Sequence, residues 1–154
     1  MYYADLSSYQ YGLDRPLPEV LNVGWLDHAE PYTVGPVPNL FSERLRLWFK
    51  SSRVNQMRGI HQCNLCHNRR SILLPIDENP SFESEGKTLF LGNWEIWVPL
   101  TEQIIFASPA LIIHYVESHG YRPPSEFVSA VMADYSQNNW KAEKEFSRRV
   151  HTHK

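Results

Sequence analysis

The stretch TLFLGNWEIWVPLTEQIIFA, residues 88–107, carries the strongest strand signal in this chain. Aromatic and branched apolar residues dominate it, and these residue types favour the pleated, half-buried surface of a sheet. The pattern predicts one strand over Thr88–Leu100 and another over Glu102–Ala107, joined by a turn near Pro99–Thr101. Gly92 lies inside the first strand and indicates a bulge or a tight turn there. These strands are expected to form the centre of a small antiparallel sheet.

Three helices are predicted around this sheet. The first covers about 39–51, with Asn39 as its N-cap and one apolar face at helical spacing. The second begins at Ser108–Pro109, a serine cap followed by proline at the first helical position, and ends near Ser118 because Gly120 favours a left-handed cap. The third begins at Ser125 and extends past Ala133 toward Val150. The expected core face of the first helix consists of Phe41, Leu45, Trp48 and Phe49.

The remaining segments complete a single α+β domain over residues 1–154, with about three strands packed against three helices. Residues 1–38 are interrupted by prolines and turn residues, which predicts a loop-rich N-terminal segment. A short apolar run at Ser71–Ile76 predicts a further strand. We expect the core over residues 39–150 and a frayed tail over residues 151–154.

Composition and charge exclude several classes of protein. Of the 154 residues, 42% are hydrophobic and 21% charged, which is enough apolar material for a packed core. The formal net charge of -2 argues against a general binder of nucleic acid or of an anionic membrane. The most apolar stretch, Ile104–Ile113, is far shorter than the ~20 residues that a membrane helix needs. The N-terminus has no signal-peptide pattern, so we expect a soluble, cytoplasmic protein.

The clearest chemical signal is a Cys-x-x-Cys knuckle at Cys63 and Cys66. Two thiolates at this spacing reach one tetrahedral ion, and nearby backbone amides can donate to the sulfurs. His114 and His119, in the second predicted helix, are candidate partners for them. An ideal helix places residues five apart about 140° from one another, so the two imidazoles are expected to share an ion only if the helix ends or loosens before His119. Soft sulfur and imidazole ligands indicate a structural zinc ion.

Several alternatives remain open for the same residues. His61 and His67 lie nearer the cysteines, and His61 with the two cysteines can supply three ligands. A three-ligand site with a bound water would instead suit a metal-dependent hydrolase, with Glu117 as the base. The cysteines can also form a redox dithiol, or two thiols without metal. The polar sequence before the knuckle disfavours the redox reading, because a thioredoxin-type motif follows a strand and opens a helix.

Enzyme signatures are missing elsewhere in the chain. The sequence holds no His-Glu-x-x-His, Gly-x-Ser-x-Gly or Gly-x-Gly-x-x-Gly motif and no phosphate-binding loop. The His-x-Glu and second Cys-x-x-Cys of zinc deaminases are also missing. We therefore favour a non-enzymatic protein. Aromatic residues make up 13% of the chain, and they suit either a thick core or a surface that contacts a protein partner.

Two motifs together resemble an uncharacterised bacterial family of unknown function. One is the Arg-Gly-x-His-x-Cys-x-x-Cys knuckle at residues 58–66, and the other is His-Tyr-Val-x-x-His-Gly-Tyr-x-Pro-Pro at residues 114–124. Small proteins of this kind are often encoded beside polymorphic toxins, and some are immunity proteins. The resemblance implies an immunity-type protein. Together with the missing enzyme signatures, the acidic balance and the many aromatic residues, it favours a zinc-stapled binding protein that occludes a protein partner such as a cognate toxin.

Overall fold

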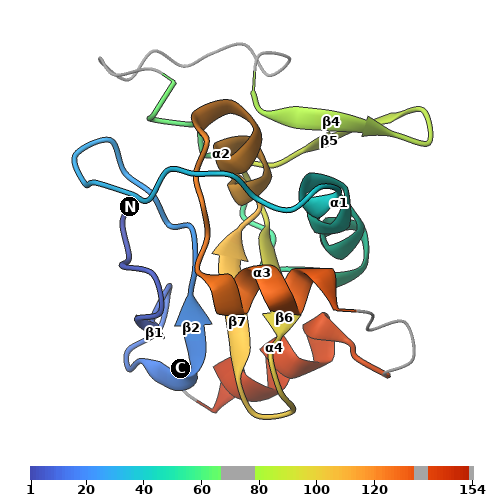
Figure 1. Ribbon diagram of the computed structural model, residues 1–154. Coiled ribbons are helices and arrows are strands. Elements are labelled where there is room, and N and C mark those ends of the chain that lie inside the picture. The colour runs from blue at the N-terminus through green and yellow to red at the C-terminus, as the bar shows by residue number, and fades with distance from the viewer. Residues whose placement is uncertain (67–78, 134–138, 153–154) are drawn as a thin grey trace.

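The protein has both sheets and helices, so the predicted α+β class is confirmed (Figure 1). The computed structural model describes residues 1–66, 79–133 and 139–152. The strands are β1 (Ser8–Tyr9), β2 (Leu17–Asn22), β3 (Arg53–Val54), β4 (Ser81–Ser84), β5 (Lys87–Phe90), β6 (Glu95–Pro99) and β7 (Ile105–Pro109). The helices are α1 (Phe41–Ser52), α2 (Ile112–His119), α3 (Ser125–Met132) and α4 (Ala142–His151). Within the described residues, no helix is long and apolar enough to cross a lipid bilayer.

The main sheet has five strands in the order β1-β2-β7-β6-β3, and β4 and β5 form a separate hairpin. The central antiparallel pair is β6 and β7, with Trp97 opposite Ala107, as the stretch 88–107 predicts. The predicted sheet of about three antiparallel strands is too small, because β2 also pairs with β7, and in parallel. This pairing lies in the segment that was expected to be loop. Pro18 precedes the paired residues that begin at Val20, so its missing N–H does not interrupt this ladder.

The strand predicted over Thr88–Leu100 is in fact two strands of different sheets. A turn over residues 91–94 separates β5 from β6. Gly92 therefore marks a change of direction rather than a bulge within one strand. The strand predicted over Ser71–Ile76 lies outside the described residues.

The helix boundaries differ from the predicted ones mainly at their N-termini. The core face of α1 is buried as predicted, but its N-cap is Leu40 in a left-handed conformation, and not Asn39. Ser108 and Pro109 belong to β7, where the Ser108 hydroxyl donates to the Ile96 carbonyl, so they do not begin α2. Gly120 ends α2 in the left-handed conformation, as predicted.

The C-terminal part is also organised differently. The predicted long third helix is two helices, α3 and α4, and the structure does not describe residues 134–138 between them. His151 is the last residue of α4 rather than the start of a frayed tail. Residues 153 and 154 lie outside the described part of the chain.

Successive residues of β6 and β7 point into two different hydrophobic clusters, because side chains alternate across a strand. Ile96 and Phe106 belong to the larger cluster, which contains the buried faces of α1, α2 and α3. Trp97 and Ile105 belong to the second cluster, in which α4 contributes Ala142 and Val150. Every residue of β6 is buried, so this strand is covered on both faces.

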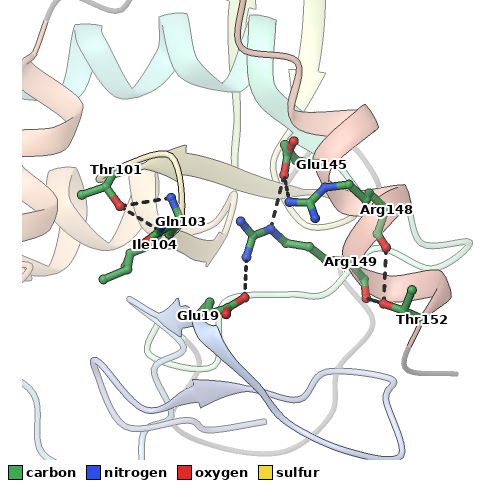
Figure 2. Close-up of polar contacts among 8 residues, drawn as sticks. All are labelled: Glu19, Thr101, Gln103, Ile104, Glu145, Arg148, Arg149 and Thr152. Atoms are coloured by element: carbon green, nitrogen blue, oxygen red, sulfur yellow. Dashed lines mark hydrogen bonds and ion pairs between the residues drawn. The ribbon is translucent and has the colours of Figure 1, made fainter.

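Arg149 joins α4 to strand β2 of the main sheet (Figure 2). Its side chain is only 7% exposed, and it donates to Glu19 of β2 at 3.2 Å and to Glu145 of α4 at 3.3 Å. Arg148 donates to the same Glu145 carboxylate at 2.7 Å but is 60% exposed.

Arg149→Ala is expected to lower the free energy of unfolding by about 1–2 kcal/mol, because it removes buried packing as well as two ion pairs. The loss stays moderate because Glu19 is 69% exposed and remains solvated without its partner. Arg148→Ala, the matched control, is expected to cost less than about 0.5 kcal/mol. Urea unfolding of the two variants measures the difference, and equal losses would contradict a special role for Arg149.

Glu95 is a fully buried carboxylate in β6 that no cation neutralises among the described residues. It accepts hydrogen bonds from Asn55 at 2.6 Å, Tyr9 at 3.0 Å and the Trp97 indole at 3.1 Å. Burial raises the pKa of Glu95 to about 7, although these three donors oppose the shift. The side chain therefore changes charge near neutral pH inside the core.

The raised pKa of Glu95 gives a pH dependence with a definite sign. Between pH 4.5 and about pH 7, the folded chain keeps a proton on Glu95 that the unfolded chain has released. Stability from this group therefore falls as the pH rises through that window, by up to about 3 kcal/mol, and is constant above it. His114 has the opposite effect because its pKa is lowered. We expect Glu95→Gln to remove the part of the free energy of unfolding that falls as the pH rises. Urea unfolding of both proteins at several pH values would show this.

Candidate metal centre

The segment that follows β3 is held against the turn between β5 and β6. The Met57 N–H donates to the Asn93 carbonyl at 2.9 Å, and the His61 N–H donates to the Gly92 carbonyl at 2.7 Å. A Cβ atom on residue 92 would lie 2.2 Å from the His61 carbonyl oxygen. Only glycine permits this approach, and it sets the position of the knuckle, residues 61–66, on the fold.

The knuckle folds as a turn around the sulfur of Cys63. The N–H groups of Leu65 and Cys66 form hydrogen bonds to this sulfur, as they do in metal-binding knuckles. Asn64 fixes the turn from outside by donating to Asp27 at 2.9 Å. Cys63 is buried and Cys66 is exposed, and neither forms a disulfide. The local backbone thus presents two free thiols on the same side as α2.

Two histidines of α2 face the knuckle. His114 lies in the first turn of the helix and His119 is its last residue, with their ring centroids 5.1 Å apart. The expected condition, that the helix ends before His119, is not met, because the helix includes this residue. The imidazoles converge nonetheless, and both Nε2 atoms contact the sulfur of Cys66.

The four candidate ligand atoms form one compact group. The sulfur of Cys66 lies 3.1 Å from Nε2 of His114 and 3.2 Å from Nε2 of His119, and the sulfur of Cys63 lies 3.4 Å from Nε2 of His119. All four atoms lie within 4.8 Å of one another. A tetrahedral zinc ion with ordinary bond lengths would separate sulfur and nitrogen ligands by about 3.5 Å. The arrangement therefore fits one tetrahedral ion, and we name these four residues the Cys2His2 cluster.

The pKa values of the cluster residues are those of the chain without a bound metal ion. Burial raises the pKa of the Cys63 thiol to about 11, although hydrogen bonds from the backbone of Cys66 and Leu65 oppose this. Burial, assisted by His119, lowers the pKa of His114 to about 4, and burial also lowers the pKa of His119. Both imidazoles are therefore neutral at pH 7, which is the form that binds metal. The Cys63 thiol is protonated, so metal binding at this sulfur must release a proton.

The outer nitrogen of His114 also has a partner. Its Nδ1 lies 3.2 Å from the hydroxyl of Ser118, one helical turn further along α2. A hydrogen bond at this nitrogen orients the ring and leaves Nε2 for the metal. Ser118 and Asn64 therefore act as supports for the ligands.

Other residues singled out in the sequence lie elsewhere. His61 is exposed and does not belong to the Cys2His2 cluster; its backbone is bonded to Gly92 at the start of the knuckle. His67 lies outside the described residues. Glu117 accepts a hydrogen bond from Arg46 of α1 at 2.6 Å and is also outside the cluster.

The residues that hold the metal ligands in place could not be predicted from sequence patterns. Asp27 and Asn64 are 37 positions apart, and neither residue has a local signal for the contact. Gly92 did give a signal, since a glycine inside a strand pattern indicates a bulge, a turn or a close backbone approach. The identity of the approaching segment depends on the tertiary fold.

One family model covers most of the chain. Residues 1–132 match the family model described as Domain of unknown function (DUF7919). The chain belongs to this family. The DUF7919 match contains all four residues of the Cys2His2 cluster and ends at the last residue of α3, so α4 lies beyond it. No curated protein and no solved structure matches the chain. Membership of DUF7919 agrees with the expected uncharacterised family, and its description names no activity, partner or source.

Proposed function

We propose that the Cys2His2 cluster holds one structural zinc ion, and that the protein acts by binding another protein. The observation that carries the metal assignment is the convergence of two sulfurs and two imidazole nitrogens from segments about fifty residues apart in the chain. Soft thiolates with imidazoles in a tetrahedral group select zinc over oxygen-preferring ions such as Mg²⁺ or Ca²⁺.

A structural role fits this ligand set better than a catalytic one. Four protein ligands complete the coordination of zinc and leave no position for an activated water. A hydrolase would need such a water and a nearby base. Glu117, the base expected for that alternative, is paired with Arg46 instead of facing the cluster. The ion pair therefore disfavours the hydrolase reading.

The task proposed for zinc is to cross-link the knuckle to α2. Residues 55–66 contain no helix or strand, and they are held by backbone bonds to the turn at Gly92 and Asn93 and by side-chain bonds such as that from Asn64 to Asp27. A segment of this kind loses much conformational entropy when it is ordered. Metal–ligand bonds offset that cost, because the free energy of binding metal becomes free energy of folding.

The proposed partner is a protein, such as a bacterial toxin that an immunity protein would occlude. Support comes from the resemblance of the two motifs, the missing enzyme signatures and the net charge of -2. The test is a 1:1 complex with a toxin encoded beside this gene, with protection of cells that express both. Failure to bind or protect against every neighbouring toxin would contradict the immunity role and leave the metal assignment intact.

The metal assignment is tested by cobalt substitution of the purified protein. Tetrahedral Co²⁺ with two thiolates gives strong visible absorption and a sulfur-to-metal charge-transfer band. We expect this spectrum from the native chain and from His61→Ala, and we expect Cys66→Ser to lose it at one equivalent of cobalt. The weak spectrum of an octahedral ion in the native chain, or an equal effect of both substitutions, would contradict the proposed ligand set.

Glu117→Gln separates the structural role from the hydrolase alternative. We expect unchanged zinc content and a loss of less than about 1 kcal/mol in the free energy of unfolding, since only a surface ion pair is removed. Elemental analysis and urea unfolding measure both quantities. A metal-dependent turnover that disappears in this variant, with zinc retained, would favour the hydrolase.

A further inference from the structure

A groove of about 410 Å³ lies at the surface between the N-terminal stretch and the loop after β2. Tyr2, Tyr3, Tyr32, Asp5 and Thr33 line it, and we name it the tyrosine groove. Figure 1 shows the N-terminus beside this loop. The volume falls in the ~300–1,000 Å³ range of ligand-binding pockets. None of the Cys2His2 cluster residues lines it, so its chemistry is independent of the metal.

Asp5 places a fixed negative charge in this groove. One carboxylate oxygen accepts the Gly24 N–H at 2.8 Å and the other accepts the Tyr121 hydroxyl at 2.8 Å. Both donors are neutral, so they hold the carboxylate in position without cancelling its charge. In the described part of the chain, no lysine, arginine, histidine or terminal amine pairs with Asp5. The side chain is exposed, so a cation from outside can reach it.

Three electron-rich rings, those of Tyr2, Tyr3 and Tyr32, line the same groove as this charge. Tyr3 stands at 90° to Trp25 and Tyr32 at 70° to Tyr121, and these edge contacts restrain the two rings. Tyr2 is 41% exposed. A cation near such rings is attracted by their quadrupoles, and a nearby carboxylate adds to the attraction. The groove therefore has the composition of an aromatic site for a positive group.

We propose that the tyrosine groove binds an arginine side chain of the protein partner. A guanidinium group stacks on aromatic rings and donates to carboxylates in a fixed geometry, which an ammonium group does less well. The acidic net charge favours the approach of a basic surface. The inference rests on the proposed function only in that the partner is a protein.

The test is an NMR titration of the full chain with N-acetyl-arginine amide, observing the tyrosine ring signals. We expect saturable shifts of Tyr2, Tyr3 and Tyr32, and no saturable shifts with N-acetyl-citrulline amide, which has the same shape without charge. Equal binding of both probes would overturn the proposal. Binding of tetramethylammonium without binding of the arginine probe would overturn it too, because the groove would then serve small quaternary amines.

Three substitutions locate the site, and two of them, Asp5→Asn and Glu30→Gln, change the net charge by the same amount. Asp5→Asn and Tyr2→Leu are each expected to weaken binding of the arginine probe about two- to fivefold, the range for exposed ion pairs and cation–π contacts. Glu30→Gln, in the same loop but outside the groove, is expected to leave binding unchanged. Equal weakening by Asp5→Asn and Glu30→Gln would show general attraction to an acidic protein and overturn the proposal. Zinc content is measured in each sample, so a failure of the metal assignment is seen separately.

Discussion

Cys66→Ser is expected to abolish stoichiometric zinc binding and to lower the melting temperature by about 8–16 °C. The estimate follows from about 4 kcal/mol of stabilisation when free zinc is a thousandfold above its dissociation constant. About 2–4 °C of melting temperature correspond to each kcal/mol in a domain of this size. Cys66 is exposed, so its replacement removes little packing and isolates the loss of a ligand. Calorimetry with elemental analysis measures both effects.

A chelator provides the control for this variant. The wild-type chain treated with chelator should melt at the temperature of Cys66→Ser, and the variant should not respond to chelator. His61→Ala should behave as the wild type, because His61 is not in the Cys2His2 cluster. If chelator leaves the melting temperature of the wild type unchanged, metal does not cross-link the fold.

Gly92→Ala is expected to lower the free energy of unfolding by about 3 kcal/mol and to weaken zinc binding at least about tenfold. The added Cβ would lie 2.2 Å from the His61 carbonyl oxygen and 2.6 Å from a side-chain carbon of Ile60. Backbone must move to relieve the first contact. The knuckle begins at His61, so this movement displaces Cys63 from α2.

Gly59→Ala is the matched control, since it adds the same methyl group to the same segment. No atom lies within 4 Å of its added Cβ, so we expect a change within about 0.5 kcal/mol and unchanged zinc affinity. Urea unfolding and competition with a coloured chelator measure both variants. A normal zinc affinity in Gly92→Ala would mean that the knuckle does not depend on its contact with this turn.

Much of the candidate site could be predicted because its ligands lie in two short motifs. The Cys-x-x-Cys spacing brings two sulfurs together locally, and the structure places His114 and His119 beside them. Whether His61 or the two histidines of α2 join the cysteines depends on the direction in which the sulfur atoms of the knuckle point. Its contacts with Gly92 and Asp27 settle that direction, and both are long-range.

The fold was predictable where its signals are local. The β6–β7 pair and the buried face of α1 follow from strand composition and helical periodicity. The parallel pairing of β2 with β7 joins residues 85 positions apart, such as Val20 and Ile105, and prolines before it suggested loop. The helix starts were wrong for a related reason: Ser108 has the residue type of a cap, but its place opposite Ile96 in the sheet outweighs that preference.

The decisive measurement for the metal assignment is the zinc-to-protein ratio of the freshly purified native chain, determined by elemental mass spectrometry beside Cys63→Ser. Cys63 supplies the buried sulfur of the Cys2His2 cluster. We expect one zinc ion per chain in the native protein and less than about a tenth of that in the variant, since tetrahedral structural sites need all four ligands. A native chain without metal, or a variant that retains a full equivalent of zinc, would contradict the metal assignment.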